Sequence, residues 1–274
     1  MLGTRPSTPR NSITRADTEI NHHRAVERVI VAMRQRLDQN FSLEDMADVA
    51  YMSPFHFNRI FRQLTGVPPC QFMSALRLES ARRLLVTTKM SVTEVCFEVG
   101  YNSLGTFIRR FTDLLGMSPR RMRSLSRLPL DPPPARSAEP VEARPVETGL
   151  RGWITAPPDF QGVVFVGLFA APIPQGRPEG CAVLAAPGPF RITSTPDGDY
   201  HLFAAGLTGV RESAGLFLYE SALRAGGQRV EVREGRADLP GDLDLRPALP
   251  TDPPILMTFP AWWDRRPAPR EQDH

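Results

Sequence analysis

The segment PFHFNRIFRQL (residues 54–64) carries side chains that can form hydrogen bonds with nucleic-acid bases. Its apolar residues recur at i, i+3, i+4 and i+7, which predicts one inward helical face made of Phe57, Ile60, Phe61 and Leu64. The opposite face then presents Phe55, His56, Asn58, Arg59 and Arg62. Arginine matches guanine O6 and N7, asparagine matches adenine N6 and N7, and an exposed aromatic ring can touch a thymine methyl group. The pattern therefore indicates contacts with bases in duplex DNA, although alone it fits an amphipathic helix with a solvated basic face equally well.

An internal repeat of about 50 residues strengthens the DNA interpretation. Residues 42–47 correspond to residues 91–96 at an offset of 49, and from Tyr51, which we match to Tyr101, the offset is 50. We place the one-residue change at the turn between two short helices. Each copy is then a helix, a turn and a second amphipathic helix, which is the helix-turn-helix plan with its second helix available for the major groove.

The elements that position these helices can also be predicted. Serines that can cap a helix precede each of the four short segments, namely Ser42, Ser53, Ser91 and Ser103. Gly66 and Gly116 stand where the two second helices should end. Between the copies, residues 69–88 contain no internal helix breaker and predict a helix of roughly 25–30 Å. Such a strut can hold two recognition helices about 34 Å apart, which is one turn of DNA.

The segment CFEVGYNSLGTFIRRFTDLLGMSPRRMR (residues 96–123) resembles the signature of the AraC/XylS family. The shared elements are the turn Gly100-Tyr101, the pair Phe107 and Phe111, and the sequence from Gly116 to Pro119. The segment SLEDMADVAYMSPFHFNRIFRQLTGVPP (residues 42–69) is similar to the first helix-turn-helix of that family. The resemblance covers residues 24–126. It implies a sequence-specific transcription regulator, an activator, with double-stranded DNA and RNA polymerase as partners and with two recognition helices in successive major grooves.

The resemblance also implies which residues contact DNA. The base-contacting positions are Phe55, Asn58 and Arg59 in the first unit, and Leu104, Gly105, Ile108 and Arg109 in the second. The second set departs from the family, because three of its usually polar positions are Leu104, Gly105 and Ile108 here. We therefore expect the first unit to supply most of the specificity and the second to anchor through phosphates, with Arg109 as its polar probe. The further DNA-contacting candidates are His56, Arg62, Ser103 and Arg120, with the cluster Arg120, Arg121 and Arg123 forming a phosphate clamp or a solvated surface.

Charge and composition divide the chain. Residues 22–127 hold 16 Lys+Arg against 9 Asp+Glu, a net charge of +7, whereas residues 128–274 hold 14 against 19, a net charge of −5. A basic half suits a polyanionic partner. We predict a multidomain protein, α plus all-β, with a disordered tail (1–21), an all-α DNA-binding domain (22–127), a Pro-rich linker (128–148), an antiparallel β-sandwich (149–266) and a tail (267–274).

The second half has a sequence pattern typical of short β-strands, as in VVFVGLF (163–169), YHLFAAG (200–206) and RVEVRE (229–234). With the turn PDGDY (196–200), it resembles the carboxypeptidase regulatory-like, transthyretin-type sandwich, which implies a fold and not an activity. Its role stays open between sensing a small-molecule effector, forming a homodimer and docking a partner protein. Its aromatic residues form a core or line an apolar pocket: Trp153, Phe165, Phe169, Trp262 and Trp263.

Several classes of protein are disfavoured. Three cysteines without a CxxC pair indicate neither a disulfide framework nor a cysteine metal site. His201 is the sole histidine between residues 57 and 273, so a catalytic or metal site in the second half would have to form around it. We expect no enzyme activity and no cofactor or metal. The N-terminus lacks a signal peptide and the longest apolar stretch, residues 162–173, is too short to span a membrane, so we expect a cytoplasmic protein.

Two rival functions remain. The apolar second recognition helix is also compatible with an architectural DNA-binding protein of low specificity. An enzyme tethered to DNA, with its site around His201, is the other.

Overall fold

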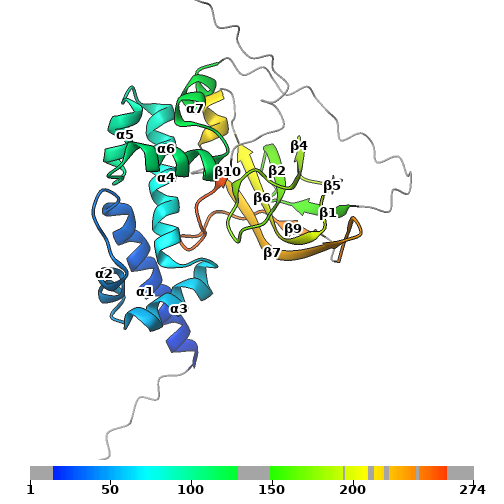
Figure 1. Ribbon diagram of the computed structural model, residues 1–274. Helices are drawn as coiled ribbons and strands as arrows, with labels where there is room; N and C mark the ends of the chain where they lie inside the picture. The colour runs from blue at the N-terminus through cyan, green and yellow to red at the C-terminus, as the bar shows by residue number, and fades with distance from the viewer. Residues whose placement is uncertain are drawn as a thin grey trace, which may run out of the picture.

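The computed structural model describes residues 15–128 and 149–257, except residues 194, 209–212, 219–221 and 239–240. A helical half stands beside a strand-rich half, and the helix α4 runs between two groups of helices, α1 to α3 and α5 to α7 (Figure 1). The helices are α1 (Arg15–Gln35), α2 (Leu43–Ala50), α3 (Pro54–Thr65), α4 (Pro69–Thr87), α5 (Val92–Glu98), α6 (Leu104–Leu115) and α7 (Pro119–Ser126). The helix α1 begins at Arg15, so the last seven residues of the predicted tail are helical.

The predicted helix starts are confirmed by their caps. The Ser42 hydroxyl accepts a hydrogen bond from the Asp45 N–H at 3.1 Å, and the Ser42 N–H donates to the Asp45 carboxylate at 2.9 Å. Ser91 and Glu94 form the same capping box at the start of α5, with distances of 3.1 and 2.6 Å. These reciprocal bonds satisfy N–H groups that have no partner inside the helix.

The two turns correspond differently from our sequence alignment. Tyr51 and Gly100 both take the left-handed conformation, with φ of 57° and 81°. Met52 and Tyr101 each donate a backbone hydrogen bond of 3.0 Å to the fifth residue before them. Tyr51 therefore matches Gly100 and not Tyr101, and the extra residue of the second unit is Asn102. The match of Tyr51 with Tyr101 was wrong, which explains why one ring is 88% exposed and the other 8%.

The strand-rich half is called the β region (residues 149–257) below. Its main sheet has the order β4-β2-β6-β7-β8 and is antiparallel and curled. A three-stranded sheet, β5-β1-β9, and a pair, β10-β3, complete it. The strands are β1 (Leu150–Thr155), β2 (Gly162–Phe169), β3 (Gln175–Gly176), β4 (Gly180–Leu184), β5 (Pro189–Ile192), β6 (Gly198–Thr208), β7 (Leu223–Arg233), β8 (Arg236–Ala237), β9 (Leu243–Asp244) and β10 (Leu256–Met257), with a 3-10 helix η1 (Ser213–Phe217).

Two pairings depart from the antiparallel prediction. The strands β1 and β9 pair in parallel, and so do β3 and β10. Both pairs join segments that lie far apart in the sequence, and each pairing covers two residues of either strand. Alternation of residue types along one strand carries no information on such a distant partner, so strand direction was not predictable here.

Both faces of the main sheet are covered. Val164 and Val166 on β2 point to the cluster shared with β1 and β5, whereas Phe165 and Phe169 belong to a cluster shared with the helices. This is why β2 is buried without alternation from Val164 onward. Phe165 and Phe169 therefore form core, as one of our two interpretations held, while Trp153 is half exposed.

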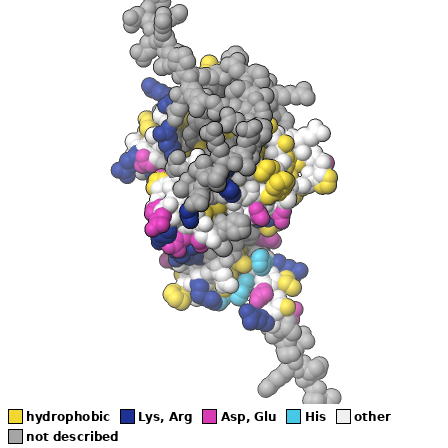
Figure 2. Space-filling view, turned by 90° about the vertical axis from the view of Figure 1, so that its right-hand side faces the viewer, with side chains coloured by type: hydrophobic (Ala, Val, Ile, Leu, Met, Phe, Trp, Pro, Cys, Tyr) yellow, Lys and Arg dark blue, Asp and Glu magenta, His cyan; other side chains and the backbone are white. Residues whose placement is uncertain are grey.

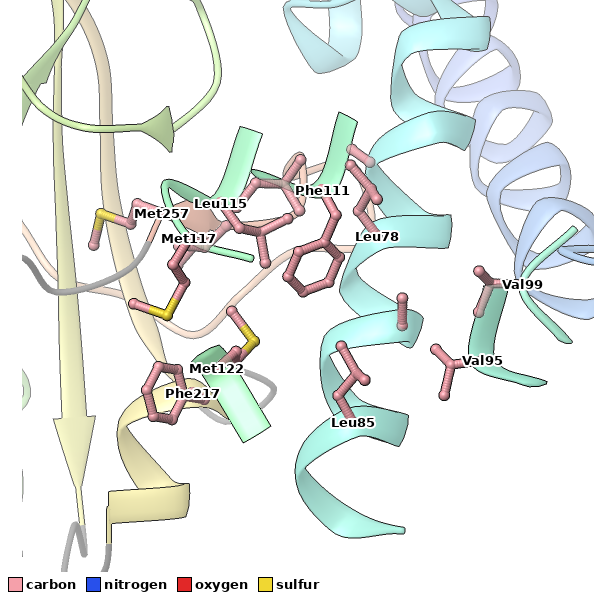
Figure 3. Packing of buried hydrophobic residues seen from close by; sticks show 14 of the residues in the cluster. Leu78, Leu85, Val95, Val99, Phe111, Leu115, Met117, Met122, Phe217 and Met257 are labelled. Carbon is pink, nitrogen blue, oxygen red and sulfur yellow. The ribbon is translucent and has the colours of Figure 1, made fainter. Parts of the chain in front are cut away.

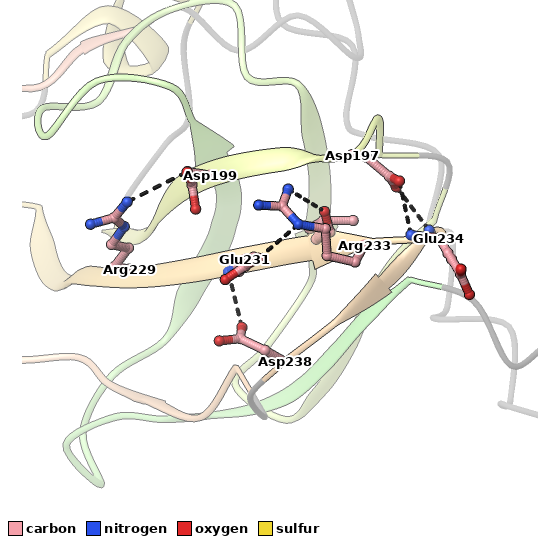
Figure 4. Close-up of polar contacts among 9 residues, drawn as sticks. Asp197, Asp199, Arg229, Glu231, Arg233, Glu234 and Asp238 are labelled. Carbon is pink, nitrogen blue, oxygen red and sulfur yellow. Dashed lines mark hydrogen bonds and ion pairs between the residues drawn. The ribbon is translucent and has the colours of Figure 1, made fainter.

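The turn PDGDY ties two parts of the main sheet together (Figure 4). The Asp197 carboxylate accepts hydrogen bonds from the N–H groups of Glu234 and Gly235 at 2.9 and 3.0 Å. These bonds lower the pKa of Asp197. The Tyr200 hydroxyl donates to the Pro196 carbonyl at 3.0 Å, which closes the turn. The motif is therefore structural.

The β region shares a core with the second helix-turn-helix unit. Phe217 and Met257 pack among Met117, Met122 and Leu85 (Figure 3). Ile173 reaches the other cluster, which holds the core of the first unit. The two helical units and the β region are thus packed against one another along α4.

Some predictions fall outside the described residues. These are most of the linker, residues 1–14 of the predicted N-terminal tail, the predicted C-terminal tail and the pair Trp262 and Trp263. Within the described part, none of the helices combines the length and the hydrophobicity that crossing a membrane needs.

Candidate nucleic-acid interface

The helices α3 and α6 are built alike. Each has 12 residues and follows a serine whose hydroxyl accepts a hydrogen bond from the N–H of the third helical residue, at 3.4 Å. Each ends at a left-handed glycine, Gly66 or Gly116, with φ of 80° and 78°. Glycine adopts this conformation without the strain that a Cβ would bring. Equal length and equal caps make the two helices equivalent parts of two repeated units.

The outward face of α3 is the predicted one. Phe57, Ile60 and Phe61 are buried in the first core. Phe55 is 84% exposed, and Arg59 and Arg62 are exposed as well. His56 and Asn58 are half-buried at the edge of this face. The arrangement leaves a guanidinium, an amide and an aromatic ring available to a ligand along one helix.

Two histidine side chains lie close to Arg59 or to each other on this face, His56 of α3 and His22 of α1. Arg59 Nη2 lies 3.3 Å from His56 Nδ1, so the guanidinium and the imidazole are neighbours on α3. The ring of His22 on α1 meets the ring of His56, with centroids 5.5 Å apart. Burial, followed by the charges of His56 and Arg59, lowers the pKa of His22. Sequence analysis missed His22, because the approach of α1 to α3 is a tertiary contact.

The outward face of α6 is mixed. Phe107 and Phe111 are buried, while Ser103, Gly105, Arg109 and the 38% exposed Ile108 lie on the surface, with Leu104 half-buried. The predicted contact positions are thus brought onto one helix. Arg110 is also exposed and was not among the predicted residues.

The basic cluster on α7 separates into two parts. Arg120 and Arg121 are exposed and fit the predicted phosphate contact or solvated surface. Arg123 is half-buried, and its Nε donates to the Leu85 carbonyl at 3.1 Å, near the end of α4. Arg123 therefore does not lie on a solvated surface, because its side chain joins α7 to α4, and its part in a phosphate clamp stays a prediction.

The β region meets both α3 and α6 near their C-terminal ends. Thr65 and Gly66 of α3 line a cavity with β6 and β7, and β3 and β10 pack beside α6. The N-terminal parts of the two helices, with Phe55 and Gly105, remain exposed. In Figure 2, Arg and His side chains gather at the lower end of the molecule, where α1 and α3 lie in Figure 1.

Comparison with known proteins agrees with this geometry. A family model described as a helix-turn-helix domain matches residues 46–124. The chain is 30% identical over 105 residues to XylDLEGF operon transcriptional activator 2 of Pseudomonas putida, a match that covers 37% of this chain and 67% of that relative. This chain belongs to the AraC family of transcription regulators. Residues 46–124 form its helix-turn-helix domain.

Other relatives match over a similar length. An uncharacterized HTH-type transcriptional regulator of Haemophilus influenzae is 35% identical over 94 residues, which is 34% of this chain and 32% of that protein. The chain thus spans about a third of the length of this curated relative. Among solved structures, the DNA-binding domain of AdpA in complex with a target DNA is 36% identical, with a TM-score of 0.35, covering 36% of this chain and 90% of that one.

Proposed function

We propose that this AraC-family regulator recognises a specific DNA site by placing α3 and α6 in successive major grooves of one duplex. The observation that carries the proposal is the pair of equivalent, exposed helices at either end of α4. At 1.5 Å per residue, the 19 residues of α4 span about 28 Å, close to one turn of DNA. One chain then does what a dimer of single helix-turn-helix units does.

On this proposal, α3 supplies most of the base contacts and α6 mainly anchors the protein to phosphates. Arg59, with Asn58 and Phe55 beside it, supplies the hydrogen bonds and the apolar contact that distinguish bases. On α6, Arg109 contacts phosphate, and Ile108 or Leu104 senses a thymine methyl group. The exposed apolar surface of Ile108 supports this assignment, because such a side chain offers bases no hydrogen bond.

Selection of bound sequences from random DNA tests the division. We expect the Arg59→Ala variant to lose discrimination at one or two base pairs, at a cost of about 1–3 kcal/mol. The Arg109→Ala variant should bind every sequence more weakly and leave the selected sequence unchanged. Gln63→Ala, an exposed change on α3 outside the predicted set, is the matched control. Unchanged discrimination in Arg59→Ala combined with its loss in Arg109→Ala would refute the division.

Salt dependence separates this function from an architectural one. A low-specificity binder shows the electrostatic salt slope without a large affinity ratio between the selected site and random DNA. We expect a ratio of at least about 10³ for the full chain at physiological salt. A ratio near one would favour the architectural alternative.

For the β region we propose a regulatory or assembly role without enzymatic activity, through a small-molecule effector or a homodimer, with RNA polymerase as a partner of the whole protein. Its packing against α4 and both units supports a role that acts on the DNA-binding half. We also propose that the β region has a transthyretin-type fold and that the protein is cytoplasmic. Among the described residues no group of three or more His, Cys, Asp or Glu side chains is placed to hold a metal.

A further inference from the structure

A cavity of about 340 Å³ lies where the β region meets the first helix-turn-helix unit. One wall is the end of α3, at Leu64, Thr65 and Gly66, and the opposite wall is formed by β6 and β7. Residues 251–257 form a third wall. Its size falls within the range of about 300–1,000 Å³ that is usual for pockets that bind small molecules.

Much of the lining is apolar. Phe203 of β6 faces the cavity, as do Ile255 and Met257 of the C-terminal segment and Pro172 and Pro174 before β3. Ile255 and Met257 are buried, whereas Phe203 is half-buried. An elongated apolar body would replace water against these side chains, at about 25 cal/mol for each Å² of apolar surface removed from water.

A single guanidinium in this lining lacks a protein anion. Arg224 on β7 donates from Nη1 to the Pro253 carbonyl at 2.9 Å, and its Nε is buried without a hydrogen-bond partner. Among the described residues it forms no salt bridge. Burial lowers the pKa of Arg224, while the charges of Glu79 and Asp252, which form no ion pair with it, counteract that effect. A buried charge without a partner is costly, and a bound carboxylate would supply the missing acceptor.

The other charged groups around the cavity are already engaged. Arg246 binds Asp252 in a bidentate pair, with both distances 2.8 Å. Glu79 of α4 pairs with Arg34 of α1 at 3.4 Å. His201 of β6 lies near Phe203, with ring centroids 6.5 Å apart. The lining therefore favours one negative charge, placed at Arg224.

We propose that this cavity binds a small organic monocarboxylate, with its carboxylate on Arg224 and its apolar body against Phe203, Ile255 and Met257. The site also touches the DNA-binding half. Its wall includes the end of the recognition helix α3, and the Ile255 carbonyl accepts a hydrogen bond of 2.5 Å from Arg82, a fully buried residue of α4. A ligand that joins these walls fixes α3 relative to α4 and so raises the affinity for DNA. This last step rests on the proposed function.

Calorimetric titration of the full chain without DNA tests the site directly. The probes are hexanoate, hexanol and hexylamine, which share one apolar body and differ in the head group. Hexanoate should bind at least about tenfold more tightly than the other two, because a hydrogen bond to a charged group is lost without the carboxylate. Equal binding of hexanol and hexanoate, or no binding of hexanoate, would overturn the proposal.

Variants of β7 assign the contact to one residue. Arg224→Met removes the charge at similar volume and should weaken hexanoate about ten- to a hundredfold. Arg229→Met, on the same strand with an exposed arginine paired to Asp199, is the matched control and should bind normally. If Arg224→Met does not fold, Arg224→Lys keeps the charge without the planar fork and should bind more weakly than wild type. Unaltered binding in either Arg224 variant would refute the assignment.

DNA binding forms the second arm of the experiment. Saturating hexanoate should raise the affinity of the wild-type chain for its selected site by at least about fivefold, and DNA should raise hexanoate affinity by the same factor. Hexanoate that binds without changing DNA affinity would contradict the regulatory step and leave the site intact. Failure to select any DNA sequence would refute the proposed function and leave the titration without DNA unaffected.

Discussion

Arg59, His56 and His22 form a small group in which protonation of His22 is linked to the position of Arg59, the side chain proposed to contact a base. Because the pKa of His22 is lowered by burial and then by His56 and Arg59, the folded state holds the proton on His22 less tightly than the unfolded state does. The stability that this group contributes is present above the unfolded pKa of about 6.5 and is lost as the pH falls through the folded value. Acidification therefore weakens the packing of α1 on α3.

Imidazole titration by NMR measures this effect. We expect the pKa of His22 to lie below its usual value in the full chain and to rise, without returning fully, in the His56→Ala variant. The remainder persists because burial is the larger cause. His23, an exposed neighbour on α1, provides the comparison within the same spectra. A His22 pKa that is unchanged by His56→Ala would contradict the coupling.

Arg120 and Arg123 are three residues apart on α7 and should respond in opposite ways to substitution. Arg123→Ala removes a charged hydrogen bond to the Leu85 carbonyl, and we expect a loss of about 1–2 kcal/mol in the free energy of unfolding. Arg120→Ala should leave stability unchanged and reduce the salt slope of DNA binding by about one. Urea unfolding and binding across salt measure the two quantities. A reduced salt slope in a stable Arg123→Ala variant would show that Arg123 also contacts DNA.

Residue positions within one helix were predictable, and contacts between elements were not. The 3.6-residue period fixed which side of α3 holds Phe57 and which holds Arg59. The bond from Arg123 to Leu85 joins residues 38 positions apart, so no local pattern contains it. For the same reason, the sequence did not predict the contact of His22 with His56, or that His201 and the end of α3 line one cavity.

At the scale of elements, the capping boxes hold the first helix of each unit in place. The backbone and side-chain hydrogen bonds of Ser91 lower the pKa of Glu94, as those of Ser42 lower the pKa of Asp45. A carboxyl group with a lowered pKa contributes stability above its unfolded pKa and loses it as the pH falls through the folded value. Both units therefore depend on ionised caps.

Removing the caps one at a time tests this dependence. Ser91→Ala should lower the free energy of unfolding by about 1 kcal/mol, and Ser42→Ala by a similar amount. Chemical denaturation at neutral pH measures the loss, and at pH 3 the difference from wild type should shrink as the partner carboxyls become protonated. Ser124→Ala, an exposed change within α7, is the control. A loss that stays constant with pH would show that the serine hydroxyls stabilise the helices independently of the ionisation of Asp45 and Glu94.

At the scale of the whole molecule, the helical units and the β region share one apolar cluster, and this sets how they unfold. Our sequence interpretation separated two domains by a linker and left their contact undetermined, because composition and periodicity describe each half by itself. The cluster instead joins Phe217 and Met257 to Met122 on α7 and Phe111 on α6. A surface of this kind makes independent motion of the two halves unfavourable.

Phe217→Ala should therefore destabilise the helical half as well as the β region. Deleting a fully buried phenylalanine leaves a cavity and costs about 3–5 kcal/mol. Native-state hydrogen exchange should show lower protection for amides of both α6 and β2, because the two halves open together. Ile20→Ala, on the exposed part of α1, should change neither. Protection that falls in β2 alone would show that the halves unfold separately, and a ligand in the cavity between them would then have no route to the recognition helices.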